Sequence, residues 1–245
     1  MSDKNVEKGA MLYEGKAKQV YETSGRDLVI IHFKDDATAF NGKKKGRIED
    51  KGIINNKLSA SFFRLLESAG VATHFVTRIN DRDMLCRNVK IIPLEVIVRN
   101  VAAGSLAKRT GQAEGTALDE PLVELTYKDD ARGDPLVTKE EAVSMGAAAP
   151  EEIDAIRGLA LQVNDILYPY LLEKKLKLID FKLEFGRSEE QIVVADEISP
   201  DTCRFWDSET GEKLDKDRFR RDLGGAKEAY MEVWNRVGDF RLSGV

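Results

Sequence analysis

The sequence has little of the chemistry by which many enzymes are recognised. Its 245 residues include only two cysteines and two histidines. Cys86 and Cys203 are too few and too isolated for a disulfide framework or a zinc site. His32 and His74 each lie in a strand-like stretch without a nucleophile or a metal ligand nearby in sequence, so we expect structural roles for both. The chain therefore offers no convincing Ser-His or Cys-His pair.

Long apolar runs are also lacking. No stretch approaches the length of a membrane span, and residues 1–5 do not show the basic and then apolar pattern of a signal peptide. The 38 basic and 43 acidic residues give a net charge of −5, so the protein as a whole does not attract nucleic acid. We therefore expect a cytoplasmic protein whose partners are neither membranes nor nucleic acids.

Apolar periodicity predicts an α+β fold. The length allows one large domain or two closely packed lobes. Strand character recurs in residues 18–21, 28–33, 71–77 and 89–98, and a helical stripe from Ile54 to Leu66 lies among them. Beyond residue 90, strands mix with a helix that opens at Pro150 and a final helical region. Pro169 lies inside the helix after Pro150 and predicts a kink or an end near Tyr168.

One segment, from Leu178 to Gly186, carries charges in a regular order. Apolar residues Ile179, Phe181, Leu183 and Phe185 alternate there with three charged ones. Alternate strand residues share a face, so Asp180, Lys182 and Glu184 form one row with roughly 7 Å between neighbours. Such a row could bind a metal-nucleotide and touch a substrate. A solvated strand face with one cross-paired lysine is the alternative.

Residues 192–196 are predicted to return from this strand as the second arm of a β-hairpin. Glu184 and Asp196 then lie on opposite arms. Two carboxylates in that arrangement suit Mg²⁺ between the phosphates of ATP, because a hard cation prefers oxygen ligands. The alternative is a pair of exposed acids near Lys182.

A second informative segment, Ile91 to Ser105, is an apolar strand that ends in a glycine loop. Arg99 ends the strand and Ser105 follows the loop. A guanidinium, a hydroxyl and free loop amides form a suitable anion site, although an arginine in a surface ion pair is common. Pro93 indicates an edge strand or a chain bend rather than a central strand.

Together, the two segments resemble the signature stretches of the SAICAR synthetase family. The likeness continues in order at residues 13–18, 134–137, 196–201 and 215–220. The family joins the carboxylate of carboxyaminoimidazole ribonucleotide (CAIR) to the amine of L-aspartate, with ATP split to ADP and phosphate, in purine biosynthesis. The resemblance implies a homodimer and a two-lobed fold, distantly similar to protein kinases and ATP-grasp enzymes, with an ATP cleft between lobes 1–90 and 91–245.

The resemblance also implies roles for individual residues. Nucleotide binding falls to Lys16 and Lys18 over the phosphates, to Ile91 and Ile92 around adenine, and to Glu184 and Asp196 through Mg²⁺. The implied substrate-binding residues are Arg99, Ser105, Asp134, Arg204 and Arg220. Lys182 and Asp180 are the implied catalytic pair. The carboxylate would be activated as an acyl phosphate, which requires no side-chain nucleophile.

Two other functions remain open. A small-molecule kinase on the same scaffold is one, although no His-Arg-Asp or Asp-Phe-Gly motif appears. The other is a non-catalytic ribonucleotide-binding protein, which would not need Glu184 and Asp196 together with Lys16. Aspartate-dependent release of phosphate from ATP distinguishes the three.

Overall fold

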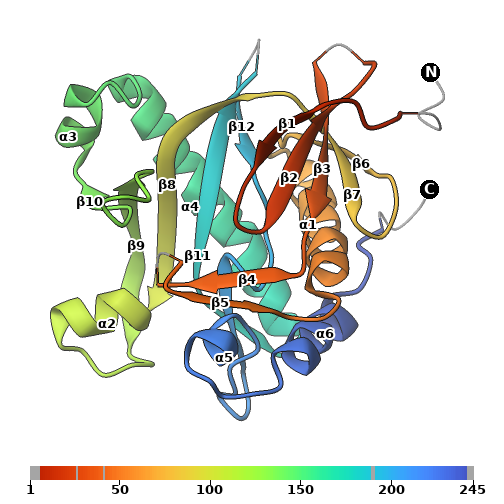
Figure 1. The fold of residues 1–245 in the computed structure, drawn as a ribbon. Helices are drawn as coiled ribbons and strands as arrows, with labels where there is room; N and C mark the ends of the chain where they lie inside the picture. Colours follow the sequence, from red (N-terminus) through yellow and green to blue (C-terminus); the bar gives the residue numbers. More distant parts are fainter. Residues whose placement is uncertain (1–5, 26, 41, 189–190, 242–245) are drawn as a thin grey trace.

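The first part of the chain forms a five-stranded antiparallel sheet (Figure 1). The computed structural model describes residues 6–25, 27–40, 42–188 and 191–241. In sheet order the strands are β1 (Met11–Glu14), β2 (Lys18–Glu22), β3 (Leu28–Phe33), β7 (Asp83–Arg87) and β6 (Phe75–Arg78). A separate hairpin consists of β4 (Asp36–Ala39) and β5 (Lys44–Arg47).

Helix α1 (Lys51–Ser68) packs directly on this sheet. It begins so close to the end of β3 that a Cβ on Gly52 would lie 2.4 Å from the carbonyl oxygen of Phe33. Glycine is therefore required at this contact, since any side chain would displace the helix. The helix ends where Gly70 adopts a positive φ of 86°, a conformation that is common at the carboxyl ends of helices and that glycine adopts readily.

A second, six-stranded sheet follows residue 90 and carries most of the charged residues singled out above. Its order is β10 (Leu136–Val137), β9 (Ala117–Tyr127), β8 (Lys90–Val101), β11 (Leu176–Arg187) and β12 (Ile192–Ala195), and β13 (Cys203–Asp207) also pairs with β11. Helix α4 (Pro150–Glu173) lies against β11 and β8, and α6 (Ala226–Val237) lies against α1. The short helices are α2 (Gly104–Thr110), α3 (Lys139–Ser144) and α5 (Asp217–Arg220).

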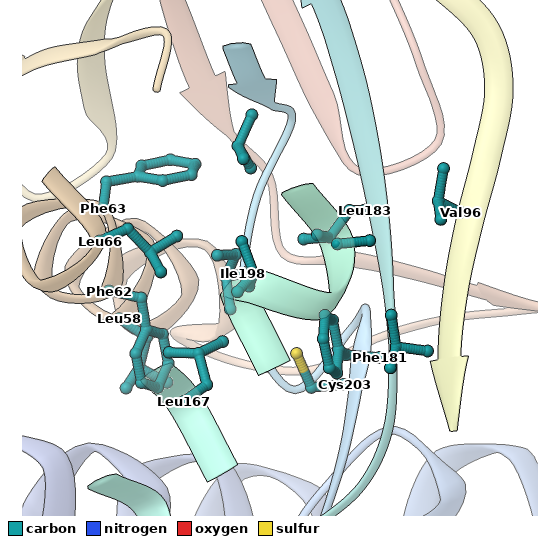
Figure 2. Packing of buried hydrophobic residues seen from close by; sticks show 14 of the residues in the cluster. Leu58, Phe62, Phe63, Leu66, Val96, Leu167, Phe181, Leu183, Ile198 and Cys203 are labelled. Atoms are coloured by element: carbon teal, nitrogen blue, oxygen red, sulfur yellow. The ribbon is translucent and has the colours of Figure 1, made fainter. Parts of the chain in front are cut away.

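One apolar core joins the two sheets. It includes side chains from β3, α1, β8, α4 and β11. Figure 2 shows Phe62 and Leu66 of α1 with Phe181 and Leu183 of β11 in this cluster. Burial of apolar surface on both sides thus holds the sheets together. No helix in the described ranges is long and apolar enough to cross a bilayer.

The predicted hairpin is confirmed, but the alternation within its first strand is interrupted. Glu184 lies opposite Ala195, so Asp196 follows directly on the second arm. Ile179 does not share the main core with Phe181, because it belongs to a small separate cluster with Val101. The pairing of β11 with β13 shifts register between Leu178 and Asp180, and such a bulge changes the face on which a side chain lies.

Among the predictions based on proline, the helix end near Tyr168 and the edge position of Pro93 need correction. Helix α4 does not end near Tyr168 but runs through Pro169 to Glu173; Leu171 in this last turn is fully buried, which offsets the lost backbone hydrogen bond. Pro93 lies in a central strand, β8, rather than at an edge. It sits where the register between β8 and β11 shifts, the kind of irregularity that accommodates a residue without an N–H.

Candidate active site

Two adjoining cavities lie between the two sheets. The first cavity has a volume of about 540 Å³ and is lined from the β1–β2 turn, β3, residues 87–91 and the strands β8 and β11. The second cavity, of about 330 Å³, extends beneath the β4–β5 hairpin toward α2 and α5. Several residues line both, among them Lys16, Lys182 and Lys216. A ligand in one cavity can therefore reach a ligand in the other.

Two members of the charged row of β11, Lys182 and Glu184, line the first cavity. Lys182 donates hydrogen bonds to Glu95 (2.6 Å) and Glu184 (3.3 Å), and Lys128 also pairs with Glu184. Burial acts to lower the pKa of Lys182, but Glu184 and Glu95 together hold it above its usual range. Glu184 is only 8% exposed. The alternative of a solvated strand face with exposed acids therefore does not apply.

A second acidic group stands at the end of β12. Lys18 donates to Asp196 and, at 2.9 Å, to Glu197. Asp196 has a positive φ of 63°, a conformation that aspartate tolerates better than most residues. Although burial acts to raise it, the ammonium groups of Lys18 and Lys182 lower the pKa of Asp196 to about 2. The group is therefore a carboxylate at neutral pH.

The opposite wall of the first cavity is apolar. Side chains of Val20, Val29, Ile31, Val89 and Ile91 line it. Ile91 is 39% exposed, whereas Ile92 is 0% exposed and does not line either cavity. The expectation that the side chains of both isoleucines surround adenine is thus corrected for Ile92, because successive strand residues face opposite sides of the sheet.

The second cavity is bordered by arginines that alternate with aspartates. Asp180 accepts hydrogen bonds from Arg99 (2.9 Å) and Arg204 (2.8 Å). Asp217 accepts from Arg204 (3.1 Å) and Arg220 (2.7 Å). Burial acts to raise the pKa of Asp217, but Arg204 and Arg220 lower it to about 2. These five residues form the arginine–aspartate chain of the cavity.

Arg99 is the most deeply placed member of this chain. It is 3% exposed and also donates to Glu124 (2.7 Å) and to the hydroxyl of Ser105 (3.1 Å). Its backbone position in β8 lies opposite Asp180 of β11. The arginine is thus held by three partners on one side while still lining the cavity.

The structure brings nearly all of the predicted site residues to these cavities. The first cavity is lined by Lys16, Lys18, Ile91, Asp134, Lys182, Glu184 and Asp196. The second is lined by Arg99, Ser105, Asp180, Arg204 and Arg220, together with Lys16 and Lys182. Asp134 also closes its own turn, because its carboxylate accepts a hydrogen bond from the backbone N–H of Asp129 at 2.9 Å.

Sequence reasoning missed several cavity residues. Glu95 shares the strand alternation of Arg99, so the period of two could have revealed it. Asp201 and Lys216 lie within segments that carry the family resemblance, yet neither stood out as a charge pattern. Lys128 lies in a turn-rich segment and reaches Glu184 only through tertiary packing, for which the sequence carries no signal.

The acids of the first cavity suit a divalent cation that brings its own ligands. In the described part of the chain, no group of three or more histidine, cysteine, aspartate and glutamate side chains is arranged to hold a metal. Glu184 and Asp196 offer hard oxygen donors from adjacent strands. Mg²⁺ is commonly bound by one or two carboxylates together with water and phosphate oxygens. The pair therefore fits Mg²⁺ on a nucleotide.

The fold and the paired cavities together define an α+β protein with a charged cleft between two antiparallel sheets. A family model described as SAICAR synthetase matches residues 11–237. The chain is 58% identical to phosphoribosylaminoimidazole-succinocarboxamide synthase of Clostridium kluyveri, over 96% of this chain and 100% of that protein. It is also 58% identical to the synthase of Desulfitobacterium hafniense, over 95% and 98%. The chain therefore belongs to the SAICAR synthetase family.

Solved structures of the same family share the fold. The synthase from Ehrlichia chaffeensis superposes with a TM-score of 0.92 at 42% identity, covering 95% of this chain and 100% of that one. A SAICAR synthetase in complex with ADP gives a TM-score of 0.90 at 48% identity, covering 96% and 100%. The predicted α+β fold of this family is thereby confirmed.

Proposed function

We propose that the protein is an ATP-dependent ligase that joins CAIR to L-aspartate, giving SAICAR, ADP and phosphate in purine biosynthesis. The observation that carries this proposal is the pair of adjoining cavities, one suited to a metal-nucleotide and the other to an anionic substrate. Membership of the SAICAR synthetase family supports it. A small-molecule kinase or a non-catalytic ribonucleotide-binding protein is not favoured by that membership.

The reaction needs activation because a carboxylate is a poor acyl donor. The γ-phosphoryl group of ATP passes to a carboxylate oxygen of CAIR, and ADP leaves. The amine of aspartate then attacks the acyl carbon, loses a proton and forms the amide, and phosphate departs with the former carboxylate oxygen. No side-chain nucleophile is required, so positioning and electrostatic stabilisation account for catalysis.

The first cavity binds the nucleotide in this proposal. The apolar wall near Ile91 accommodates adenine, and a relative solved with ADP supports nucleotide binding here. Lys16 and Lys18 turn to the phosphates, since an ammonium on a flexible stem can follow a moving group. Glu184 and Asp196 hold Mg²⁺, which would neutralise phosphate charge.

The second cavity binds the ribotide. Arg204 and Arg220 supply charge, and Ser105 supplies a hydroxyl, for the phosphate or carboxylate of CAIR. Arg99 holds Asp180 and Ser105 in place while lining the cavity. Lys182, at the boundary of the two cavities, stabilises the charge that is transferred, and Asp134, which lines the first cavity, binds the substrate in this proposal.

Three broader features are part of the same proposal. We infer a homodimer and a division into lobes 1–90 and 91–245, both by analogy with the family. We also infer a cytoplasmic location, which the two buried free cysteines would suit because thiols stay reduced there. Static light scattering, which measures the molar mass in solution, would test whether the protein is a dimer.

The decisive experiment measures ADP release with each substrate omitted in turn. We expect turnover only when ATP, CAIR and aspartate are all present, with one SAICAR formed for each ADP. Full ADP release without aspartate would instead identify a kinase or an ATPase. Binding of the ribotide without any ADP release would identify a non-catalytic binding protein.

A further inference from the structure

The junction between the cavities contains a lysine that has no role in the function proposed above. Lys216 lines both cavities, and its side chain is 13% exposed. It lies in the segment just before α5. Its backbone N–H donates to the carbonyl oxygen of Pro200 at 3.0 Å, which fixes the lysine beside the loop that carries Asp201.

Asp201 is the nearest acid, but its oxygens are occupied by other donors. The buried ammonium of Lys51 donates to Oδ2 at 2.7 Å, and the hydroxyl of Tyr230 donates to Oδ1 at 2.8 Å. The ammonium of Lys216 stands 3.7 Å from Oδ1, which is beyond hydrogen-bond distance. Asp201 therefore holds Lys216 by charge without satisfying its N–H groups.

The other lysines of the junction are better satisfied. Lys182 donates to two carboxylates, and Lys16 donates to Asp130. No acceptor for the ammonium of Lys216 is found among the residues that the structure describes. A largely buried ammonium with unused donors is costly unless a ligand supplies oxygens. Among the described residues, the geometry thus leaves the ammonium of Lys216 open toward both cavities.

The electrostatic surroundings of Lys216 favour an incoming anion. Burial lowers the pKa of Lys216, the charges of Lys51 and Arg220 act in the same direction, and Asp201 and Glu197 oppose them. The lysine therefore faces cations from α1 and α5 as well as two acids of one loop. An anionic oxygen placed beside it would relieve this repulsion.

We propose that Lys216 is a catalytic residue that contacts an anionic oxygen, phosphoryl or carboxylate, where the two cavities meet. The inference rests on the proposed function, because only a reaction between groups in both cavities brings such an oxygen to the junction. Lys216 then stabilises negative charge on the group that is transferred or attacked. Its pre-set position beside Asp201 makes it a preorganised donor of the kind that accelerates charge-developing reactions.

The test compares Lys216→Met with Lys213→Met in the full-length protein. Lys213 bonds Glu114 at 3.1 Å, lies over the ring of Trp206 and lines neither cavity, so its variant should keep the normal rate. We expect Lys216→Met to lose about 100-fold in activity. A fall in kcat at unchanged KM values assigns the oxygen to the transferred phosphoryl group. A raised KM for aspartate alone assigns it to the carboxylate of aspartate.

Two further results would overturn the inference. If Lys216→Met keeps normal kcat and KM values while the unchanged protein shows aspartate-dependent turnover, the lysine has no contact with reacting groups. If the double variant Asp201→Asn, Lys216→Met recovers activity, Lys216 only balances the charge of Asp201. Thermal unfolding confirms that each variant is folded. If the unsubstituted protein shows no aspartate-dependent turnover, the proposed function is refuted, and the role of Lys216 with it.

Discussion

Lysines supply most of the positive charge that lines the first cavity, whereas in the second cavity three arginines join the three lysines that line both. In the first, Lys18, Lys128 and Lys182 are paired with the acids Asp196, Glu184 and Glu95. In the second, Arg99, Arg204 and Arg220 alternate with Asp180 and Asp217. The cavities adjoin, so this difference in residue type arises within one continuous cleft.

The two kinds of cation suit different tasks. A lysine ammonium is a compact charge on a flexible stem and can exchange one partner for another. An arginine guanidinium is a planar fork that holds two oxygens in fixed geometry. The lysine side of the cleft is therefore suited to a phosphoryl group that moves, and the arginine side to a substrate group that stays bound throughout the reaction.

The largest loss of activity is expected when an acid on the lysine side of the cleft is neutralised. Glu184→Gln and Asp196→Asn each keep the side-chain shape but remove a charge that we propose for Mg²⁺. We expect each to lower the rate of phosphoryl transfer by about 10³-fold, the scale on which one charge matters in this chemistry. The effects should be non-additive, because both groups serve one ion.

The Mg²⁺ concentration that gives half-maximal activity is the measurement for these variants. Glu120→Gln is the control, since Glu120 lies exposed on β9 and lines neither cavity. Lys182→Met should lose rate without a change in Mg²⁺ dependence. An unchanged half-maximal concentration in both acid variants would mean that the metal is held elsewhere and that the paired acids are structural.

The next largest effect is expected on ribotide binding, when an arginine on the arginine side of the cleft is removed. Arg204→Ala removes the link between Asp180 and Asp217, and we expect it to weaken ribotide binding by about 2–5 kcal/mol. Nucleotide affinity should stay nearly normal. Arg236→Ala is a matched control, because Arg236 also bonds two acids, Asp207 and Glu232, outside both cavities. Calorimetric titration with CAIR and with an ATP analogue separates the two sites; a selective loss of nucleotide binding would show that the cavities have been assigned in reverse.

Arg99→Ala is a poorer test of the same side. Arg99 is buried with Asp180 and Glu124, so its removal deprives two buried carboxylates of a charged partner. Breaking a buried ion pair in this way costs on the order of 3–5 kcal/mol of stability. The free energy of unfolding should therefore fall clearly in this variant and much less in Arg204→Ala, whose guanidinium is more exposed.

Local periodicity was sufficient to predict which residues share a face of the cleft. The period of two placed Lys182 and Glu184 together, and the hairpin placed Asp196 beside them. The same rule could have separated Ile91 from Ile92. These inferences succeed because strand geometry depends only on neighbouring residues in the chain.

Contacts between distant strands could not be predicted in this way. The pairing of Arg99 with Asp180 depends on the register of β8 against β11, which the packing of both sheet faces sets. The bulge that separates Ile179 from the main core has the same origin. The buried support of Asp201 by Lys51 and Tyr230 likewise joins three distant parts of the chain.

A smaller effect, on stability rather than activity, is expected at Asp215, which supports the arginine–aspartate chain. Asp215 is fully buried and accepts hydrogen bonds from the backbone N–H groups of Phe205 and Asp217. Burial and the charge of Asp217 raise the pKa of Asp215 to about 7. The folded protein then keeps a proton that the unfolded chain releases near pH 4. Asp215 therefore contributes stability at low pH that is lost as pH rises from about 4 to 7.

Asp215→Asn should remove this pH dependence while keeping an acceptor for the backbone. We compare the free energy of unfolding of the variant with that of the unsubstituted protein at each pH. From pH 4 to pH 7, we expect the variant to gain stability relative to the unsubstituted protein by on the order of 2–3 kcal/mol. Urea unfolding at several pH values measures it. A constant difference across this range would mean that Asp215 is ionised throughout.

The smallest effect is expected for the cysteines, which lie outside both cavities. Cys86 and Cys203 are buried, and burial raises the pKa of each thiol, so neither is a thiolate at neutral pH. The double variant Cys86→Ala, Cys203→Ser should keep most of its kcat, with a modest loss of stability from the removed core contacts. Steady-state kinetics and thermal unfolding together check this. A loss of several orders of magnitude in a folded variant would reveal a covalent intermediate, and the assignment of catalysis to charge and position in the two cavities would then be wrong.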